Sequence, residues 1–162
     1  MSSSTEELRI AMETTLTTFL ENYHIAVRDK NASLLSAVLS PDCTRHLKPS
    51  SFVDAYPFIK GAETNAEYKA RMTPEIALME ETRAKILESA VDPANRTASA
   101  RAEHWTKIAN REPTTLEICW FLDFTDDGTK ISRVVEFIDT AVATRMIEDM
   151  LKQGYRKDEN ST

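Results

Sequence analysis

The sequence predicts an α+β fold in which helices cover one face of an antiparallel sheet. Residues 5–72 carry mainly helical apolar spacing, residues 79–138 carry two pairs of strand-like runs joined by turn signals, and an amphipathic run follows. Strands grouped together after helices are typical of the α+β class. A strongly curved sheet that holds the helices in its concavity leaves a pocket at its open end.

Length and composition indicate one ordinary globular domain. The chain of 162 residues is 41% hydrophobic and 28% charged, which suits a single domain over residues 1–162 with a sizeable core. We expect polar, frayed ends at about 1–4 and 157–162. The formal net charge of −6 argues against nucleic acid and anionic membranes as partners, because both need a concentrated basic face.

Targeting signals and cysteine usage indicate the compartment. No apolar run approaches the roughly 20 residues that span a bilayer, and the acidic, polar N-terminal segment is unlike a signal or transit peptide. We therefore expect a cytoplasmic location. We expect Cys43 and Cys119 to be two buried thiols rather than a disulfide or a metal site.

Helical spacing dominates the first part of the chain. A first helix is predicted from Thr5 to Arg28, and a short second one is predicted from the cap Asn31 through Leu39, before Pro41 ends it. The first helix carries an apolar stripe of Leu8, Met12, Leu16, Phe19, Tyr23 and Val27.

Shorter elements follow. Residues 42–49 predict a short strand, residues 50–63 a loop, and residues 64–72 a third helix. Alternation along the strand sets Cys43, Arg45 and Leu47 on one face and Thr44, His46 and Lys48 on the other.

Two hairpins are predicted next. Residues 79–91 favour a helix by propensity but alternate like a strand, and residues 97–108 alternate again after a strong turn at 92–95. A long hairpin is therefore predicted. Its second strand carries Ala100, Ala102, His104 and Thr106 on one face.

The second hairpin has the strongest local signal in the chain. Residues 115–124 and 130–138 are rich in β-branched and aromatic side chains, and Asp127-Gly128 lies between them. A final helix is predicted to begin near Asp139 or Thr140, with Gly154 as its stop. Its apolar face comprises Val142, Met146, Ile147, Met150 and Leu151.

This order of elements resembles the cone-shaped α+β barrel of the nuclear transport factor two-like superfamily, which includes SnoaL-like polyketide cyclases, ketosteroid isomerase and scytalone dehydratase. Short motifs are also similar to those of small fungal members, the isomerases that rebuild a lactone-bearing ring in terretonin-type meroterpenoid biosynthesis. The motifs are Asp42-Cys43 with His46 and Pro49, Thr64-Asn65-Ala66-Glu67-Tyr68, Asp127-Gly128 with Ile131, and Glu136-Phe137-Ile138-Asp139.

The resemblance implies a pocket between the concave face of the sheet and the helices. It implies acid–base catalysis by a few polar side chains in an apolar cavity, without a cofactor. It also implies a homodimer, which we expect to form through the sheet.

Glu136 is the main candidate for a catalytic acid or base. It shares a strand face with Val134 and Ile138, and burial of a carboxylate raises its pKa toward the range useful near neutral pH. Alternatively, this face is wet and Glu136 pairs with a nearby arginine or lysine. The resemblance adds His46 or Asp139 as its catalytic partner, although Asp139 also stands where a helix cap is expected.

A second set of residues is expected to bind the substrate. Asn65 and Tyr68, one helical turn apart, can present an amide and a phenol to a ligand carbonyl, or simply cap and pack. Aromatic walls suit a polycyclic terpenoid and equally suit any core. The other expected binding residues are Glu67, His104, Trp105, Trp120 and Phe121.

Other chemistries lack their motifs. Three glycines form no phosphate-binding loop, the three histidines lack zinc-ligand spacing, and no serine lies in a nucleophile elbow.

Three hypotheses for the function follow. The first is a cofactor-independent isomerase or cyclase of a lipophilic polycyclic substrate, the second is a non-catalytic ligand-binding or dimeric interaction module, and the third is a scytalone-type dehydratase with a histidine–aspartate pair on one water.

Overall fold

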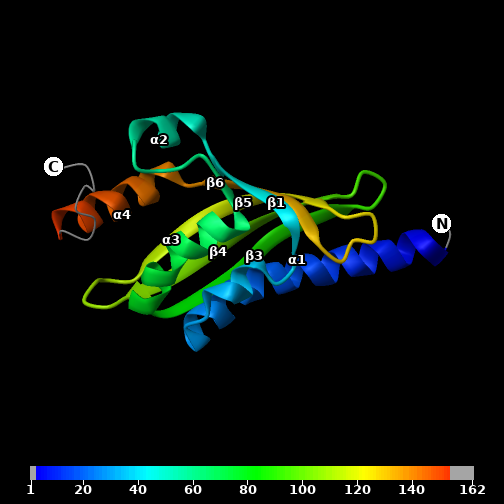
Figure 1. Ribbon diagram of the computed structural model, residues 1–162, viewed down its shortest axis with the longest axis horizontal. Helices are drawn as coiled ribbons and strands as arrows, with labels where there is room; N and C mark the ends of the chain where they lie inside the picture. The colour runs from blue at the N-terminus through cyan, green and yellow to red at the C-terminus, as the bar shows by residue number, and fades with distance from the viewer. Residues whose placement is uncertain (1–2, 154–162) are drawn as a thin grey trace.

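The computed structural model describes residues 3–153, and its helices and strands follow the predicted order (Figure 1). The elements are α1 (Ser3–Asp29), the 3-10 helix η1 (Ala32–Ser36), β1 (Leu39–Lys48), α2 (Ser50–Ala55), β2 (Ala62–Thr64), α3 (Asn65–Leu78), β3 (Met79–Asp92), β4 (Thr97–Ile108), β5 (Thr114–Phe124), β6 (Ile131–Ile138) and α4 (Thr140–Lys152).

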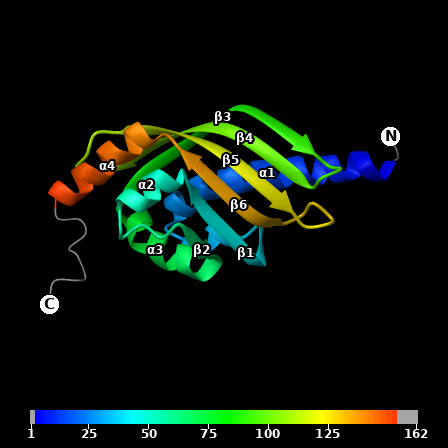
Figure 2. The same cartoon turned by 90° about the horizontal axis from the view of Figure 1, so that it is seen from above.

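The strands form one six-stranded sheet in the order β2-β1-β6-β5-β4-β3. Figures 1 and 2 show this sheet curving around α1 and α3, with α4 extending beyond one end. The predicted α+β fold with a curved sheet around N-terminal helices is therefore confirmed. One detail differs, because β1 pairs parallel with β6 while the other neighbours are antiparallel.

The inner face of the sheet is built from the alternation that the sequence shows. Along β4, Ala98, Ala100, Ala102, His104 and Thr106 are buried, and their neighbours along the strand are more exposed. The first part of the α1 stripe, Leu8 to Phe19, shares one core cluster with this face, whereas Tyr23 and Val27 pack in a second cluster with η1 and α3. Residues 79–91 form β3 despite their helix propensity because they pair with β4 along the whole strand, from Met79 opposite Ile108 to Asp92 opposite Thr97.

Three segments differ from their predictions. β1 already begins at Leu39 and contains Pro41, which the sheet accommodates because the register with β6 shifts between Leu39 and Thr44. The predicted loop 50–63 holds α2 and most of β2. α3 continues past its predicted end and through Pro74 to Leu78.

The second hairpin and the last helix have the predicted local chemistry. Gly128 adopts a positive φ of 70° in the turn, and the Thr15 hydroxyl donates a hydrogen bond to its carbonyl at 2.8 Å. Asp139 caps α4, because its carboxylate accepts from the amides of Ala141 and Val142. The predicted stop at Gly154 lies outside the described residues.

The remaining expectations concern the ends, the thiols and the membrane. α1 already includes Ser3, within the end segment predicted to fray, whereas residues 157–162 lie outside the described residues. Cys43 is buried as expected, but Cys119 lies half-buried on the outer face of the sheet. Among the helices within residues 3–153, none combines the length and the apolar character needed to cross a membrane.

Candidate active site

Two adjoining cavities lie between the inner face of the sheet and the helices. The α4 lobe, of about 210 Å³, is walled by α4 and by α2 with the loop after it. The α1 lobe, of about 190 Å³, is walled by α1, α3 and the middle of the sheet. Six residues line both lobes, namely Arg45, Arg71, Glu75, Leu116, Glu136 and Met146. Together the lobes reach the lower part of the about 300–1,000 Å³ range of ligand sites.

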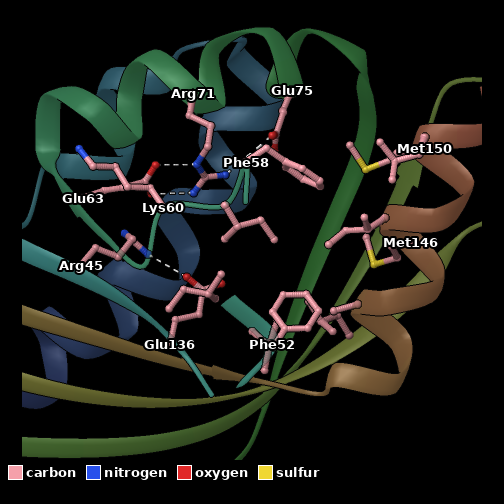
Figure 3. Close-up of a pocket in the computed structure, with 17 residues that line it drawn as sticks. Arg45, Phe52, Phe58, Lys60, Glu63, Arg71, Glu75, Glu136, Met146 and Met150 are labelled. Carbon is pink, nitrogen blue, oxygen red and sulfur yellow. Dashed lines mark hydrogen bonds and ion pairs between the residues drawn. The ribbon is translucent and has the colours of Figure 1, made fainter. Parts of the chain in front are cut away.

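Glu136 lies at the junction of the two lobes. The register of β6 with β1 places Leu47 beside Glu136 and Arg45 beside Val134, so all four residues share the inner face. The Glu136 carboxylate lies 3.6 Å from Nη1 of Arg45, and the two side chains are 18% and 7% exposed. Figure 3 shows this pair across the α4 lobe from Met146.

The electrostatics of Glu136 combine two opposing effects. Burial raises the pKa of its carboxyl above the ordinary value, and the guanidinium groups of Arg45 and Arg71 pull that pKa back down. The two alternatives drawn from the sequence therefore both hold in part. Glu136 faces the interior, and it also pairs with an arginine.

Arg45 enters the cavity from β1 with an unused hydrogen-bond donor. Its guanidinium carbon lies 3.8 Å from the ring centroid of Tyr68, a stacked cation–π contact. Its Nε is buried and has no hydrogen-bond partner within residues 3–153. An unmet buried donor costs about 1–3 kcal/mol, and a ligand acceptor would remove that cost.

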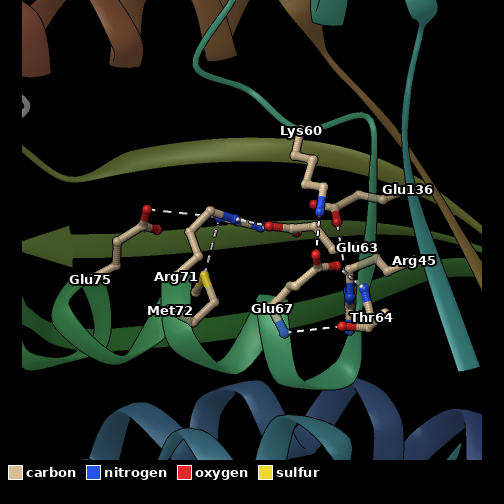
Figure 4. A network of polar contacts seen from close by, with 9 residues as sticks. All are labelled: Arg45, Lys60, Glu63, Thr64, Glu67, Arg71, Met72, Glu75 and Glu136. Carbon is tan, nitrogen blue, oxygen red and sulfur yellow. Dashed lines mark hydrogen bonds and ion pairs between the residues drawn. The ribbon is translucent and has the colours of Figure 1, made fainter. Parts of the chain in front are cut away.

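A second ion-pair group lies beside the first, on α3. Arg71 holds Glu63 through two hydrogen bonds of 2.7 and 2.9 Å, and its Nη1 lies 3.8 Å from Glu75 (Figure 4). With Glu136 and Arg45, this gives three carboxylates and two guanidinium groups at or beside the junction.

Uncharged polar groups line the α1 lobe. Burial raises the pKa of the Tyr23 and Tyr68 phenols, so both are neutral hydrogen-bond donors near pH 7. The Tyr23 hydroxyl lies 3.6 Å from the Met79 sulfur. Nε1 of Trp120 donates to Nε2 of His104 at 3.1 Å, and burial lowers the pKa of that histidine to about 4.

The two residues expected as catalytic partners of Glu136 do not lie beside it in the structure. His46 lies on the opposite face of β1, where its Nε2 is 3.0 Å from the Thr44 hydroxyl, and Asp139 is an exposed helix cap. Neither lines a lobe. The charged side chain beside Glu136 is Arg45 instead, because the strand alternation that turns Arg45 inward turns His46 outward.

Three of the expected binding residues lie in the α1 lobe, and four lie elsewhere. Tyr68, His104 and Trp120 line that lobe. The other four line neither lobe. Asn65 donates a hydrogen bond to the Ser40 carbonyl at 2.9 Å, and Glu67 forms the capping box of α3 and pairs with Lys60. Trp105 stacks on Arg83, and Phe121 is 49% exposed on the outer face of the sheet.

Sequence reasoning missed most of the ionic groups at the junction. Arg45 had a signal, because a charged side chain sits between Cys43 and Leu47 on one strand face. Arg71 and Glu75 on α3 had none, because charged residues along a helix normally face solvent. Glu63 lies in a segment predicted to be a loop, which the structure shows as β2. Within residues 3–153, no group of three or more histidine, cysteine or acidic side chains is arranged to hold a metal ion.

Comparisons with known proteins show the fold. No family model matches the sequence, and a comparison with curated protein sequences finds no match. Two similar solved structures are BvnE pinacolase from Penicillium brevicompactum (16% identity, 90% of this chain and 94% of that chain, TM-score 0.77) and PrhC from Penicillium brasilianum (15%, 90% and 91%, 0.76).

A third similar structure is an NTF2-like protein of unknown function from Burkholderia pseudomallei (16% identity, 85% of this chain and 97% of that chain, TM-score 0.64). The nuclear transport factor two-like fold that the sequence predicts is therefore confirmed. At such low identity the likeness is one of fold.

Proposed function

We propose that this protein is a cofactor-independent isomerase or cyclase that rearranges a lipophilic polycyclic substrate by acid–base chemistry. One observation carries the proposal. A half-buried carboxylate, Glu136, lies beside a buried guanidinium, Arg45, at the junction of two cavity lobes with mainly apolar walls. An apolar skeleton fills such walls, and the reacting group meets the charged junction.

The junction supports a proton shuttle. In its ionised form Glu136 takes a proton from a substrate carbon beside a carbonyl, or from a hydroxyl, and after exchange with solvent a proton is returned at another position. Arg45 stays charged throughout and donates hydrogen bonds to the oxygen on which negative charge develops. The product is an isomer of the substrate, so the chemistry consumes no co-reactant.

The finer proposal concerns the substrate class. The motif resemblance favours a meroterpenoid whose lactone-bearing ring is rebuilt, as in fungal secondary metabolism. The fold likeness to BvnE pinacolase supports a rearrangement, since acid–base groups in an apolar cavity suffice for that kind of reaction.

The other two hypotheses find less support. A non-catalytic module would suit an ion-paired carboxylate in solvent or a filled pocket, whereas Glu136 is only 18% exposed and neither lobe is filled by side chains. A scytalone-type dehydratase requires a histidine–aspartate pair. His104 pairs with Trp120, and His46 lies outside the lobes.

Glu136→Gln tests the proposal, because it keeps the size of the side chain and removes its proton transfer. We expect turnover of an oxygenated terpenoid lactone to fall at least about 100-fold, measured by chromatography as a product of unchanged mass. In D₂O the wild-type product should carry deuterium at the reprotonated carbon.

Glu80→Gln is the matched control, because Glu80 is exposed on β3 and outside both lobes. Its turnover should equal that of the wild type. Undiminished turnover by Glu136→Gln would refute the assignment of Glu136.

A further inference from the structure

The α1 lobe contains a histidine whose hydrogen-bonding pattern is fixed by a tryptophan. His104 on β4 and Trp120 on β5 both face the inner side of the sheet, and the indole Nε1 lies 3.1 Å from the imidazole Nε2. Trp120 is also the Cα partner of Glu136 on β6. The strand of Trp120, β5, therefore lies between the strands of Glu136 and His104.

This contact determines where the imidazole carries its proton. An indole N–H only donates, so Nε2 of His104 must accept and cannot be protonated. A neutral imidazole with a free Nε2 carries its hydrogen on Nδ1. Within residues 3–153, Trp120 is the one hydrogen-bond partner of this ring, which leaves the Nδ1–H unused.

The surroundings determine which ligand atom this donor suits. Burial keeps the imidazole neutral, with a pKa of about 4, so His104 adds no positive charge to the lobe. Glu75 and Glu136 line the same lobe together with Arg45 and Arg71, so its carboxylates and guanidinium groups are equal in number and paired with one another. Its other walls are largely apolar. A neutral oxygen acceptor on an apolar skeleton meets both conditions.

We propose that the Nδ1–H of His104 binds an uncharged acceptor oxygen of the ligand, a ketone, lactone or ether oxygen, in the α1 lobe on the far side of Trp120 from Glu136. His104 then positions the ligand, and Trp120 fixes the tautomer that allows it. The inference deepens the proposed function, on which it rests for the apolar, oxygenated character of the ligand. The protein thus contacts polar groups of the ligand at two places, the junction and His104.

The first measurement is the tautomer. In protein labelled with ¹⁵N-histidine, ring ¹⁵N–¹H spectra should show His104 neutral with its hydrogen on Nδ1, and the His104→Gln spectrum assigns the signal among three histidines. In Trp120→Phe we expect a mixture of tautomers. A hydrogen on Nε2 in the wild type would overturn the proposal.

The second measurement uses two probes of similar shape, 2-decalone, which has a carbonyl, and trans-decalin, which has none. The ketone should shift the His104 Nδ1 resonance and bind about five- to tenfold more weakly to His104→Phe. The affinity for decalin should change less than twofold. His104→Gln should largely restore ketone binding, because its amide can both accept from Trp120 and donate to the probe.

Equal responses to the two probes, or no binding of either, would overturn the proposal. These readouts involve no turnover. Full activity of Glu136→Gln would therefore contradict the proposed function without affecting the His104 result. An inactive Glu136→Gln together with equal responses to the two probes would contradict only the role of His104.

Discussion

The ion pair at the lobe junction must offset the cost of taking both charges out of water. Moving a carboxylate and a guanidinium out of water is unfavourable, and their mutual attraction offsets this only when further contacts support both ions. Arg45 gains such support from the Tyr68 ring, whereas its Nε lacks a partner among the described residues. The junction therefore remains incompletely satisfied until a ligand arrives, as expected for a functional site.

The free energy of unfolding should depend on pH through His104. Its folded-state pKa, about 4, lies below the ordinary 6.5, so the unfolded chain binds more protons between these values. Stability therefore falls as pH drops from 6.5 toward 4, by about 3 kcal/mol for this group. Urea unfolding across this range should show the loss in the wild type.

His104→Gln is the control for this prediction, because glutamine does not titrate. The difference in unfolding free energy between the two proteins should change by about 3 kcal/mol from pH 7 to pH 4. A pH-independent difference would mean that His104 is protonated as easily in the folded chain as in the unfolded one.

At the scale of elements, the β5–β6 turn joins the sheet to the first helix. Gly128 has a φ of 70°, and a Cβ there would lie 2.8 Å from Met12 Cγ and 2.9 Å from Leu8 Cδ1 of α1. Its carbonyl also accepts from Thr15. The turn residue that favours the hairpin is thus also the residue that lets the hairpin approach α1.

Gly128→Ala should lower the unfolding free energy by about 2–4 kcal/mol, because left-handed strain adds to the steric overlap with α1. Gly61→Ala is the matched control, since its backbone has no positive φ and its new Cβ would meet only Val53 Cγ1, at 3.2 Å. Denaturant unfolding measures both. Similar losses in the two variants would contradict the role assigned to the turn.

At the scale of the whole molecule, the outer face of the sheet carries an apolar patch. Phe121 and Phe137 are 49% and 46% exposed there, on adjacent strands β5 and β6. Val135, paired with Phe121, and Cys119, paired with Phe137, lie between them. Exposed aromatic side chains in one patch favour a protein contact, and we propose that a second copy of this chain covers it.

A Phe121→Asp/Phe137→Asp variant should therefore be monomeric, because it places charges at the centre of the contact. Light scattering after size exclusion, at micromolar concentration, should give twice the chain mass for the wild type and one chain mass for the variant. Ile10→Asp is the control, as Ile10 is an exposed apolar residue on α1, and it should remain dimeric. A monomeric wild type would rule out the proposed dimer.

The sequence by itself determined the elements whose signals are local. Alternation set the bounds of β4, the Asp127-Gly128 turn set the second hairpin, and Asp139 set the start of α4. Strand alternation also turned Glu136 inward, because neighbouring side chains on a strand point to opposite faces.

Only the tertiary structure decided what stands around Glu136. The parallel pairing of β1 with β6 brings Arg45 to it and leaves His46 outside, and the packing of α3 adds Arg71 and its acids. These contacts join residues far apart in the chain, and their energies depend on burial that no local pattern specifies. The carboxylate was therefore predictable from sequence, whereas its partners were not.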